Sequence, residues 1–171
     1  MKVKFSFISL IFIFFSIFYI FYLGLKNSSI YTPNVEIKKN VPLFEAVIFD
    51  TNKKISSEKL FERNKYYLMN IWSSWCIPCK EEHKYLMNLK KKNLEIIGLN
   101  YKDNLNQAKK FLNELGNPYE IILSDENGII AIEWGAYGVP ETFLIKNNQI
   151  IKKIIGPLNE KLLFEIKELT Q

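Results

Sequence analysis

The chain of 171 residues carries 23 basic and 18 acidic side chains, and 48% of its residues are hydrophobic. This composition is typical of a globular protein rather than a disordered chain, and the length suits a single domain with a short additional segment. Three of the basic residues and none of the acidic ones lie within the first 26 positions, which leaves a net charge of only +2 for the rest. Such a small surplus excludes the strongly basic surface of a nucleic-acid-binding protein.

An uncharged run of 21 residues, Phe5 to Leu25, fills most of the N-terminus. As a helix it would extend over roughly 31 Å, enough to cross a hydrocarbon core of about 30 Å. It is longer than the apolar part of a signal peptide, about 7–15 residues, and no small-x-small cleavage site follows it. We therefore expect residues 1–25 to form an uncleaved membrane anchor. Lys2 and Lys4 precede the run and Lys26 alone follows it directly, which predicts a C-terminal domain outside the cytoplasm.

Residues 26–40 are polar and rich in turn-forming side chains, which predicts a linker. From residue 41 to 171, short apolar runs alternate with amphipathic segments, the pattern of an α/β domain. The run from Tyr66 to Trp72 is apolar enough to be a central strand buried on both faces. We expect further strands or apolar runs at 47–49, 94–99, 119–123, 142–145 and 150–155, helices at 76–90, 104–115 and 159–169, and a brief helix or irregular segment at 129–134.

Local signals mark the ends of several of these elements. Asn104 can cap the helix that follows it, with Gln107 as its capping-box partner, and Gly116 followed by Pro118 ends that helix. Asn147-Asn148 lies between two apolar runs and predicts a tight hairpin turn, because asparagine tolerates positive φ.

Both cysteines and the only histidine lie in the stretch WSSWCIPCKEEH, residues 72–83. A strand that ends at Trp72 and a helix that begins with the C-x-x-C place both sulfurs at a helix N-terminus. There the unpaired backbone N–H groups and the helix dipole lower the pKa of the first thiol. Cys76 is then the exposed attacking sulfur, and Cys79 is the less accessible sulfur that resolves the mixed disulfide. Pro78 suits the first helical turn, where its missing N–H costs no hydrogen bond.

Other interpretations of the cysteine pair stay open. A structural zinc site needs four ligands, and the sequence offers Cys76, Cys79, His83 and at best a carboxylate. The same three residues make a copper-handling or metallochaperone domain conceivable. A disulfide without exchange activity would close a very small loop and stabilise little. We favour a redox pair that uses no cofactor and no metal, and we expect His83 to pack or to orient a neighbour.

The segment GVPETFLI, residues 138–145, adds a second feature. In a thioredoxin-like sheet, a cis-proline precedes a strand and packs against the cysteine pair. Pro140 stands at such a position, where its missing N–H does not break a strand ladder. We therefore expect a cis peptide bond before Pro140, and a substrate groove lined by Trp75, Val139 and Pro140.

Several blocks then occur in the order and at the spacing of one known family. These are WCIPC with the following Glu82-His83, IGLNYKD at 97–103, ELGNPY at 114–119 and GAYGVPETFLI at 135–145. From about Val41 to its end the sequence resembles the CcmG/DsbE family, membrane-anchored thioredoxin-like thiol:disulfide interchange proteins of cytochrome c maturation. The resemblance implies a thioredoxin-like α/β fold, with a central mixed sheet and flanking helices, preceded by one N-terminal transmembrane helix.

The resemblance also implies a function. Members reduce the disulfide in the C-x-x-C-H haem-attachment site of apocytochrome c. The expected substrate is therefore apocytochrome c or another cytochrome c maturation component, and the electron donor is a transmembrane thiol carrier of the DsbD/CcdA type. The expected location is the bacterial inner membrane, with a single pass and the C-terminal domain in the periplasm. A general periplasmic disulfide reductase is the alternative within the same chemistry.

Two glutamates bear on the direction of electron flow. Glu82 and Glu141 match acidic positions of the family's active site, while Ile77-Pro78 between the cysteines offers no charge and no side-chain donor. Carboxylates near the sulfurs disfavour the thiolate, which makes the couple more reducing. The catalytic residues that we expect are Cys76, Cys79, Glu82, Pro140 and Glu141.

Overall fold

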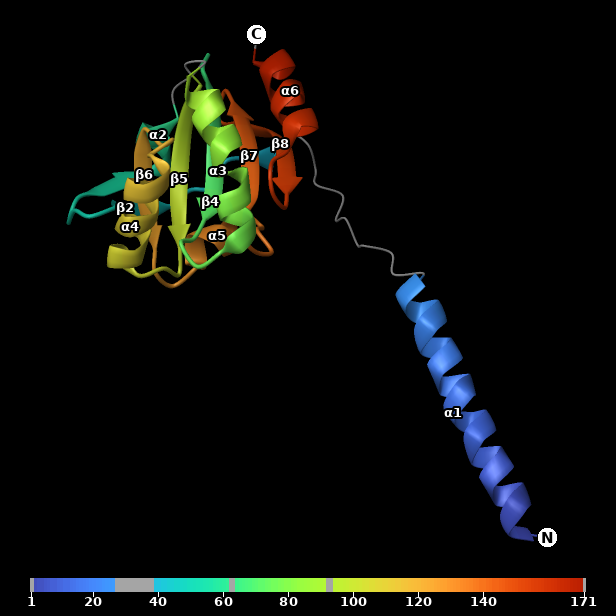
Figure 1. The fold of residues 1–171 in the computed structure, drawn as a ribbon. Coiled ribbons are helices and arrows are strands. Elements are labelled where there is room, and N and C mark those ends of the chain that lie inside the picture. The colour runs from blue at the N-terminus through green and yellow to red at the C-terminus, as the bar shows by residue number, and fades with distance from the viewer. Residues whose placement is uncertain (1, 27–38, 62–63, 92–93, 171) are drawn as a thin grey trace. The chain divides into compact units, whose positions relative to one another are not determined.

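The computed structural model describes residues 2–26, 39–61, 64–91 and 94–170 (Figure 1). Its contacts divide the chain into two units, Met1–Val35 and Glu36–Gln171. Most of the predicted linker, residues 26–40, lies outside the described residues.

The first unit contains one helix, α1 (Lys2–Lys26), which covers the uncharged run. Its described side chains are exposed, and the rings of Phe14 and Phe15 meet edge to face with their centroids 5.9 Å apart. Within the described part of the chain, no helix is long and apolar enough to cross a membrane. A helix therefore forms where we expect one, but the transmembrane part of the prediction is not confirmed.

In the second unit, the described residues form one mixed sheet with the strand order β1-β8-β7-β4-β5-β6-β2-β3. Neighbours are parallel between β4, β5 and β6 and antiparallel elsewhere. Strand β4 lies between β5 and β7, and six of its seven residues are buried, which confirms the central strand. The strands are β1 (Lys39–Asn40), β2 (Glu45–Ile48), β3 (Lys54–Ser56), β4 (Tyr66–Trp72), β5 (Glu95–Tyr101), β6 (Ile121–Asp125), β7 (Glu141–Lys146) and β8 (Gln149–Ile155).

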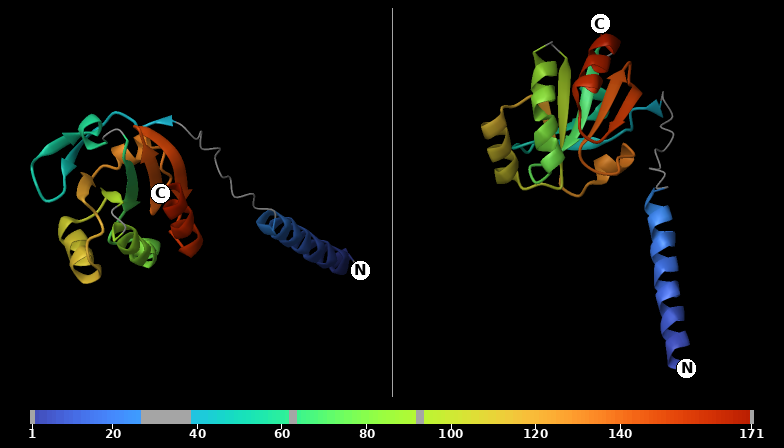
Figure 2. Two further views of the ribbon diagram at one scale, coloured as in Figure 1. Left: turned by 90° about the horizontal axis from the view of Figure 1, so that it is seen from above. Right: turned by 45° about the vertical axis from the view of Figure 1, so that its right-hand side comes forward.

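Helices cover both faces of this sheet (Figure 2). They are α2 (Ser57–Leu60), α3 (Ile77–Lys90), α4 (Leu105–Leu115), α5 (Ile129–Glu133) and α6 (Glu160–Leu169). Because side chains alternate along a strand, β4 contributes to two cores. Leu68 and Trp72 join the core under α3, α4 and α6, whereas Met69 and Ile71 join the core under α2 and α5. The thioredoxin-like α/β arrangement of mixed sheet and flanking helices is confirmed.

The predicted cap and end of α4 are confirmed. The side chain of Asn104 accepts hydrogen bonds from the N–H groups of Asn106 and Gln107, and Gly116 ends α4 with φ 88°. The N–H of Asn104 donates to Asp103, so the reciprocal bond of a capping box with Gln107 is not confirmed. Asn147 and Asn148 form the β7–β8 turn with φ values of 52° and 60°.

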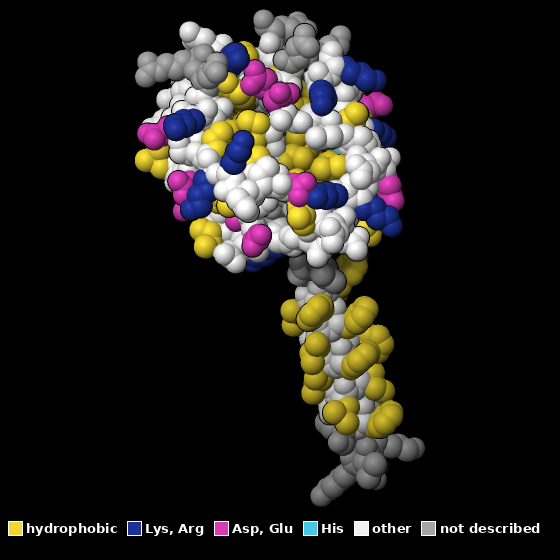
Figure 3. All heavy atoms as spheres, turned by 90° about the vertical axis from the view of Figure 1, so that its left-hand side faces the viewer, with side chains coloured by type: hydrophobic (Ala, Val, Ile, Leu, Met, Phe, Trp, Pro, Cys, Tyr) yellow, Lys and Arg dark blue, Asp and Glu magenta, His cyan; other side chains and the backbone are white. Residues whose placement is uncertain are grey.

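The surface of the domain is mixed in charge on the face that Figure 3 shows. Lysine and acidic side chains are interspersed there, and they surround a hollow in which hydrophobic side chains gather.

Candidate active site

The cysteine pair lies where strand β4 passes into helix α3. Cys76 is the N-cap residue of α3, and its Sγ accepts a 3.1 Å hydrogen bond from the N–H of Cys79. The two cysteines form a disulfide. Cys76 is 5% exposed and Cys79 is 2% exposed, so both residues are buried in this oxidised state, and the predicted exposure of the Cys76 sulfur is not confirmed. The residues beside it, Trp75 and Ile77, are largely exposed.

The loop before β7 lies against the hydrophobic cluster that contains the two cysteines. The peptide bond between Val139 and Pro140 is cis, as predicted. Val139 packs against the hydrophobic cluster that contains both cysteines, and the carbonyl of Pro140 accepts a 3.0 Å bond from the N–H of Gly156. Of the three residues expected to line a groove, Trp75 is exposed, Val139 is half-buried and Pro140 is buried.

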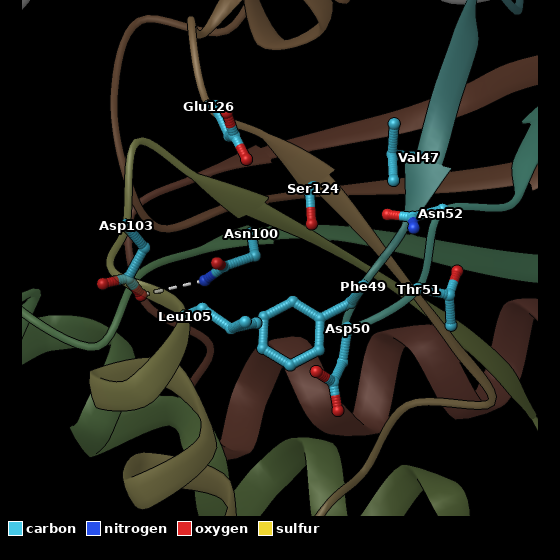
Figure 4. Close-up of a pocket in the computed structure, with 10 residues that line it drawn as sticks. All are labelled: Val47, Phe49, Asp50, Thr51, Asn52, Asn100, Asp103, Leu105, Ser124 and Glu126. Atoms are coloured by element: carbon cyan, nitrogen blue, oxygen red, sulfur yellow. Dashed lines mark hydrogen bonds between the residues drawn. The ribbon is translucent and has the colours of Figure 1, made fainter.

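The Ser73–Trp75 connection is bound to the loop after β5. Ser74 donates to the carboxylate of Asp103 through both its N–H and its hydroxyl, each at 2.6 Å, and Trp75 Nε1 donates to the carbonyl of Lys102 at 3.1 Å. Asp103 also accepts from Asn100 Nδ2 at 2.9 Å (Figure 4). Asp103 lies in the NYKD block, but its role as the acceptor for Ser74 was not predicted.

Asp103 and Asn100 line a hollow of about 390 Å³, together with residues near β2 and β6. Figure 4 shows the side chains that line it. One lining residue, Asp103, thus also binds Ser74 in the connection that carries Cys76.

Glu82 is fully buried on α3, three residues after Cys79. Its Oε1 accepts from Asn70 Nδ2 at 2.8 Å, and its Oε2 accepts from the N–H of Leu158 at 2.9 Å. Burial raises the pKa of Glu82 from 4.5 to about 7, and the two hydrogen bonds only partly oppose this shift. The carboxyl group is thus poised to gain or lose a proton near neutral pH, so the negative charge predicted from the sequence is present only in its deprotonated form.

Glu141, at the start of β7, is 1% exposed. Its Oε1 accepts hydrogen bonds from the N–H groups of Tyr137 at 2.6 Å and Gly138 at 3.1 Å. Its Oε2 lies 2.9 Å from Lys153 Nζ on strand β8, and this contact is an ion pair without the geometry of a directed hydrogen bond. The expectation that Glu141 adds a net negative charge beside the sulfurs therefore needs correction, because Lys153 compensates the charge.

His83 is buried on α3 and packs against neighbouring residues. Its Nε2 lies 2.8 Å from the carbonyl oxygen of Gly116, so this nitrogen carries the hydrogen. The ring meets Phe111 edge to face, and burial lowers the imidazole pKa. Among the described residues, no group of three or more His, Cys, Asp or Glu side chains is arranged to hold a metal ion. The three candidate ligands of the metal interpretation are thus not brought together.

Comparison with known proteins adds to this geometry. The Redoxin family model matches residues 37–170. The thiol:disulfide interchange protein DsbE of Vibrio cholerae is 38% identical over 161 residues, which cover 84% of this chain and 87% of the relative. The chain belongs to the DsbE family. DsbE of Escherichia coli K12 is 39% identical over 126 residues, which cover 73% of this chain and 68% of the relative.

Solved structures agree on the fold. A putative DsbE from Chlorobium tepidum superposes with a TM-score of 0.67 at 20% identity, covering 81% of this chain and 100% of the other. Membership of the DsbE family and the disulfide at the start of α3 together make this chain a thiol:disulfide oxidoreductase.

Proposed function

We propose that this DsbE-family chain reduces the disulfide in the C-x-x-C-H site of apocytochrome c during cytochrome c maturation. The observation that carries the proposal is the buried carboxyl group of Glu82, three residues after Cys79, combined with the absence of any cationic or hydrogen-bonding side chain at Ile77-Pro78. Above its pKa of about 7, the Glu82 carboxylate disfavours a thiolate on the same helix. The oxidised pair is then stabilised relative to the reduced pair, as a reductant requires.

The exchange begins with the reduced pair. The Cys76 thiolate attacks one sulfur of the substrate disulfide, a Cys76–substrate disulfide forms, and the other substrate sulfur leaves as a thiolate that takes up a proton. Cys79 then loses its proton and attacks Cys76 Sγ, which releases the second substrate thiol. Two electrons have moved to the substrate, and the Cys76–Cys79 disulfide is the product.

Glu82 also has a role in proton transfer during this exchange reaction. Residues three apart on a helix are neighbours on its surface, so Glu82 and Cys79 occupy neighbouring positions on α3. With a pKa of about 7, the Glu82 carboxyl group can accept the Cys79 proton when that sulfur attacks.

The proposal includes the location and the electron supply. The uncharged run from Phe5 to Leu25 supports a single-pass anchor in the bacterial inner membrane with the domain in the periplasm. An anchored domain can meet a transmembrane thiol carrier of the DsbD/CcdA type, which returns two electrons to the Cys76–Cys79 disulfide.

Alkaline extraction of membranes tests the anchor: the full chain should stay in the pellet, and a chain lacking residues 1–35 should not. Full release of the intact chain would contradict anchoring.

A trapping experiment tests the reaction and its substrate. Cys79→Ala should accumulate a mixed disulfide between Cys76 and an oxidised C-x-x-C-H peptide, because the resolving sulfur is gone. Cys76→Ala should trap nothing. Trapping that requires Cys79 and not Cys76 would reverse the assigned roles. Equal rates of reduction for C-x-x-C-H peptides and for unrelated peptide disulfides would instead support a general periplasmic reductase.

A further inference from the structure

Lys153 is a buried cation beside the cis-proline loop. It lies on β8 opposite Phe143 of β7, and its side chain is only 4% exposed. Its Nζ lies 2.9 Å from Glu141 Oε2, donates to the carbonyl of Gly135 at 2.7 Å and stands 4.2 Å from the centroid of the Tyr137 ring. A buried ammonium group is costly unless it is paired and hydrogen-bonded, and here it is both.

These contacts lie on both sides of Pro140, because Gly135 and Tyr137 precede it and Glu141 follows it. The Glu141 carboxylate accepts from the N–H groups of Tyr137 and Gly138, while Lys153 binds the carbonyl of Gly135 and the free oxygen of the same carboxylate. Glu141 thus binds N–H groups of the loop of residues 135–138, and Lys153 binds a carbonyl group of the same loop.

The position of this loop matters for the cysteines. Val139, the next residue, packs against the hydrophobic cluster that contains Cys76 and Cys79. The Tyr137 ring is 66% exposed although its face lies against the Lys153 ammonium group, so a cation–π contact orients an aromatic ring that is open to a binding partner. Aromatic rings held in one orientation bind a partner at a low entropic cost.

We infer that Lys153 is a positioning residue for the substrate peptide: with Glu141 it fixes the loop of residues 135–138, and thereby the exposed Tyr137 and, beside the cysteine cluster, Val139. The inference rests on the proposed function in that a peptide disulfide is the substrate. Loss of Lys153 should therefore weaken peptide binding more than it changes the intrinsic reactivity of Cys76.

Four proteins test this inference: the wild type, Lys153→Met, Lys153→Met with Glu141→Gln, and Lys152→Met. Lys153→Met leaves the buried Glu141 carboxylate without its partner, and this variant can fail to fold for that reason. The double variant removes both buried charges and therefore still tests the role of Lys153. Lys152 is the matched control, because it is the adjacent lysine on β8 and pairs with Glu165 on α6 instead.

Reduction of an oxidised C-x-x-C-H peptide and alkylation of Cys76 by iodoacetamide are measured for each protein. Both Lys153 variants should raise KM for the peptide about tenfold, and this change should be several times larger than the change in the alkylation rate of Cys76. Lys152→Met should match the wild type. Wild-type KM values in both Lys153 variants, or equal losses in peptide reduction and alkylation, would overturn the inference.

Amide hydrogen exchange at Tyr137 and Gly138 separates this inference from the proposed function. Protection should fall about tenfold in the Lys153 variants and stay at the wild-type level in Lys152→Met. If the wild type reduces no C-x-x-C-H peptide, the proposed function fails, and the exchange data still decide the role of Lys153. Equal protection in all four proteins overturns it.

Discussion

Asn70 on β4 donates a 2.8 Å hydrogen bond to Glu82 on α3, and both side chains are completely buried. The same Asn70 amide group donates to Thr142 Oγ1 at 3.0 Å, and its Oδ1 accepts from the Tyr119 hydroxyl at 2.8 Å. One amide thus connects the CxxC helix, the adjacent strands β4 and β7, and Tyr119, two residues before β6. Because a buried polar group is costly without partners, this network fixes where the Glu82 carboxyl group lies relative to the cysteine helix.

Glu82 should make the stability of the domain depend on pH. Its pKa in the folded state is about 7, above the unfolded value of 4.5, so the folded state keeps this proton to a higher pH. Between these two values the unfolded state binds fewer protons, and the free energy of unfolding therefore falls as pH rises, by a few kcal/mol in total, and levels off above about pH 7. Urea unfolding of the wild type and Glu82→Gln over this range measures the effect, which the variant should lose.

His83 changes the free energy of unfolding with pH in the opposite direction to Glu82. Burial lowers the pKa of His83, so in acid its protonation favours the unfolded state. Its contribution is common to both proteins and cancels in their difference. Glu81→Gln is the matched control, since Glu81 is the preceding residue on α3 and is exposed. A Glu82→Gln variant with the same pH dependence as the wild type would show that Glu82 does not titrate in this range.

Asp103→Asn should destabilise the domain and slow the attacking sulfur. Asp103 accepts from the Ser74 N–H and hydroxyl, from Asn100 Nδ2 and from the N–H of Asn104, and an amide leaves one oxygen for these donors. The loss of charged hydrogen bonds should cost about 1.5–3 kcal/mol in the free energy of unfolding. Because Ser74 immediately precedes Trp75-Cys76, the alkylation rate of Cys76 should fall as well.

The control for Asp103 is Asp50→Asn. Asp50 makes an exposed ion pair with Lys109, and such a pair contributes no more than about 1 kcal/mol. Equal changes in unfolding free energy for the two variants would contradict the role of Asp103.

His83→Phe should affect stability and leave catalysis intact. The new ring can still pack on Phe111, but the carbonyl of Gly116 loses its 2.8 Å partner. The expected cost is about 1–3 kcal/mol in the free energy of unfolding, with kcat for peptide disulfide reduction within about twofold of the wild type. Thermal unfolding and the peptide assay measure both quantities. A large loss of kcat without a loss of stability would assign His83 a direct catalytic role.

The sequence predicts those parts of the fold that depend on local signals. The apolar run from Tyr66 to Trp72, the cap at Asn104 and the Asn147-Asn148 turn all lie where they are expected. Strands β1 and β3 and helix α2 were not predicted, because they have only two, three and four residues and carry no measurable periodicity.

The site is predictable only where its residues are close in sequence or match a known block. The cysteine pair and the cis bond before Pro140 meet those conditions. The pairs Asn70–Glu82, Ser74–Asp103 and Glu141–Lys153 bring together different elements, and no local pattern indicates them. Asn70 alone left a signal, since a polar residue within an apolar central strand must find buried partners.

The reduction potential of the Cys76–Cys79 couple, measured by equilibration with glutathione or dithiothreitol, tests the central claim most directly. A reductant of apocytochrome c should have a value between about −200 and −270 mV, and the reduced protein should open the disulfide of a C-x-x-C-H peptide. A value near about −120 mV, which is typical of a strong oxidant, would contradict the account.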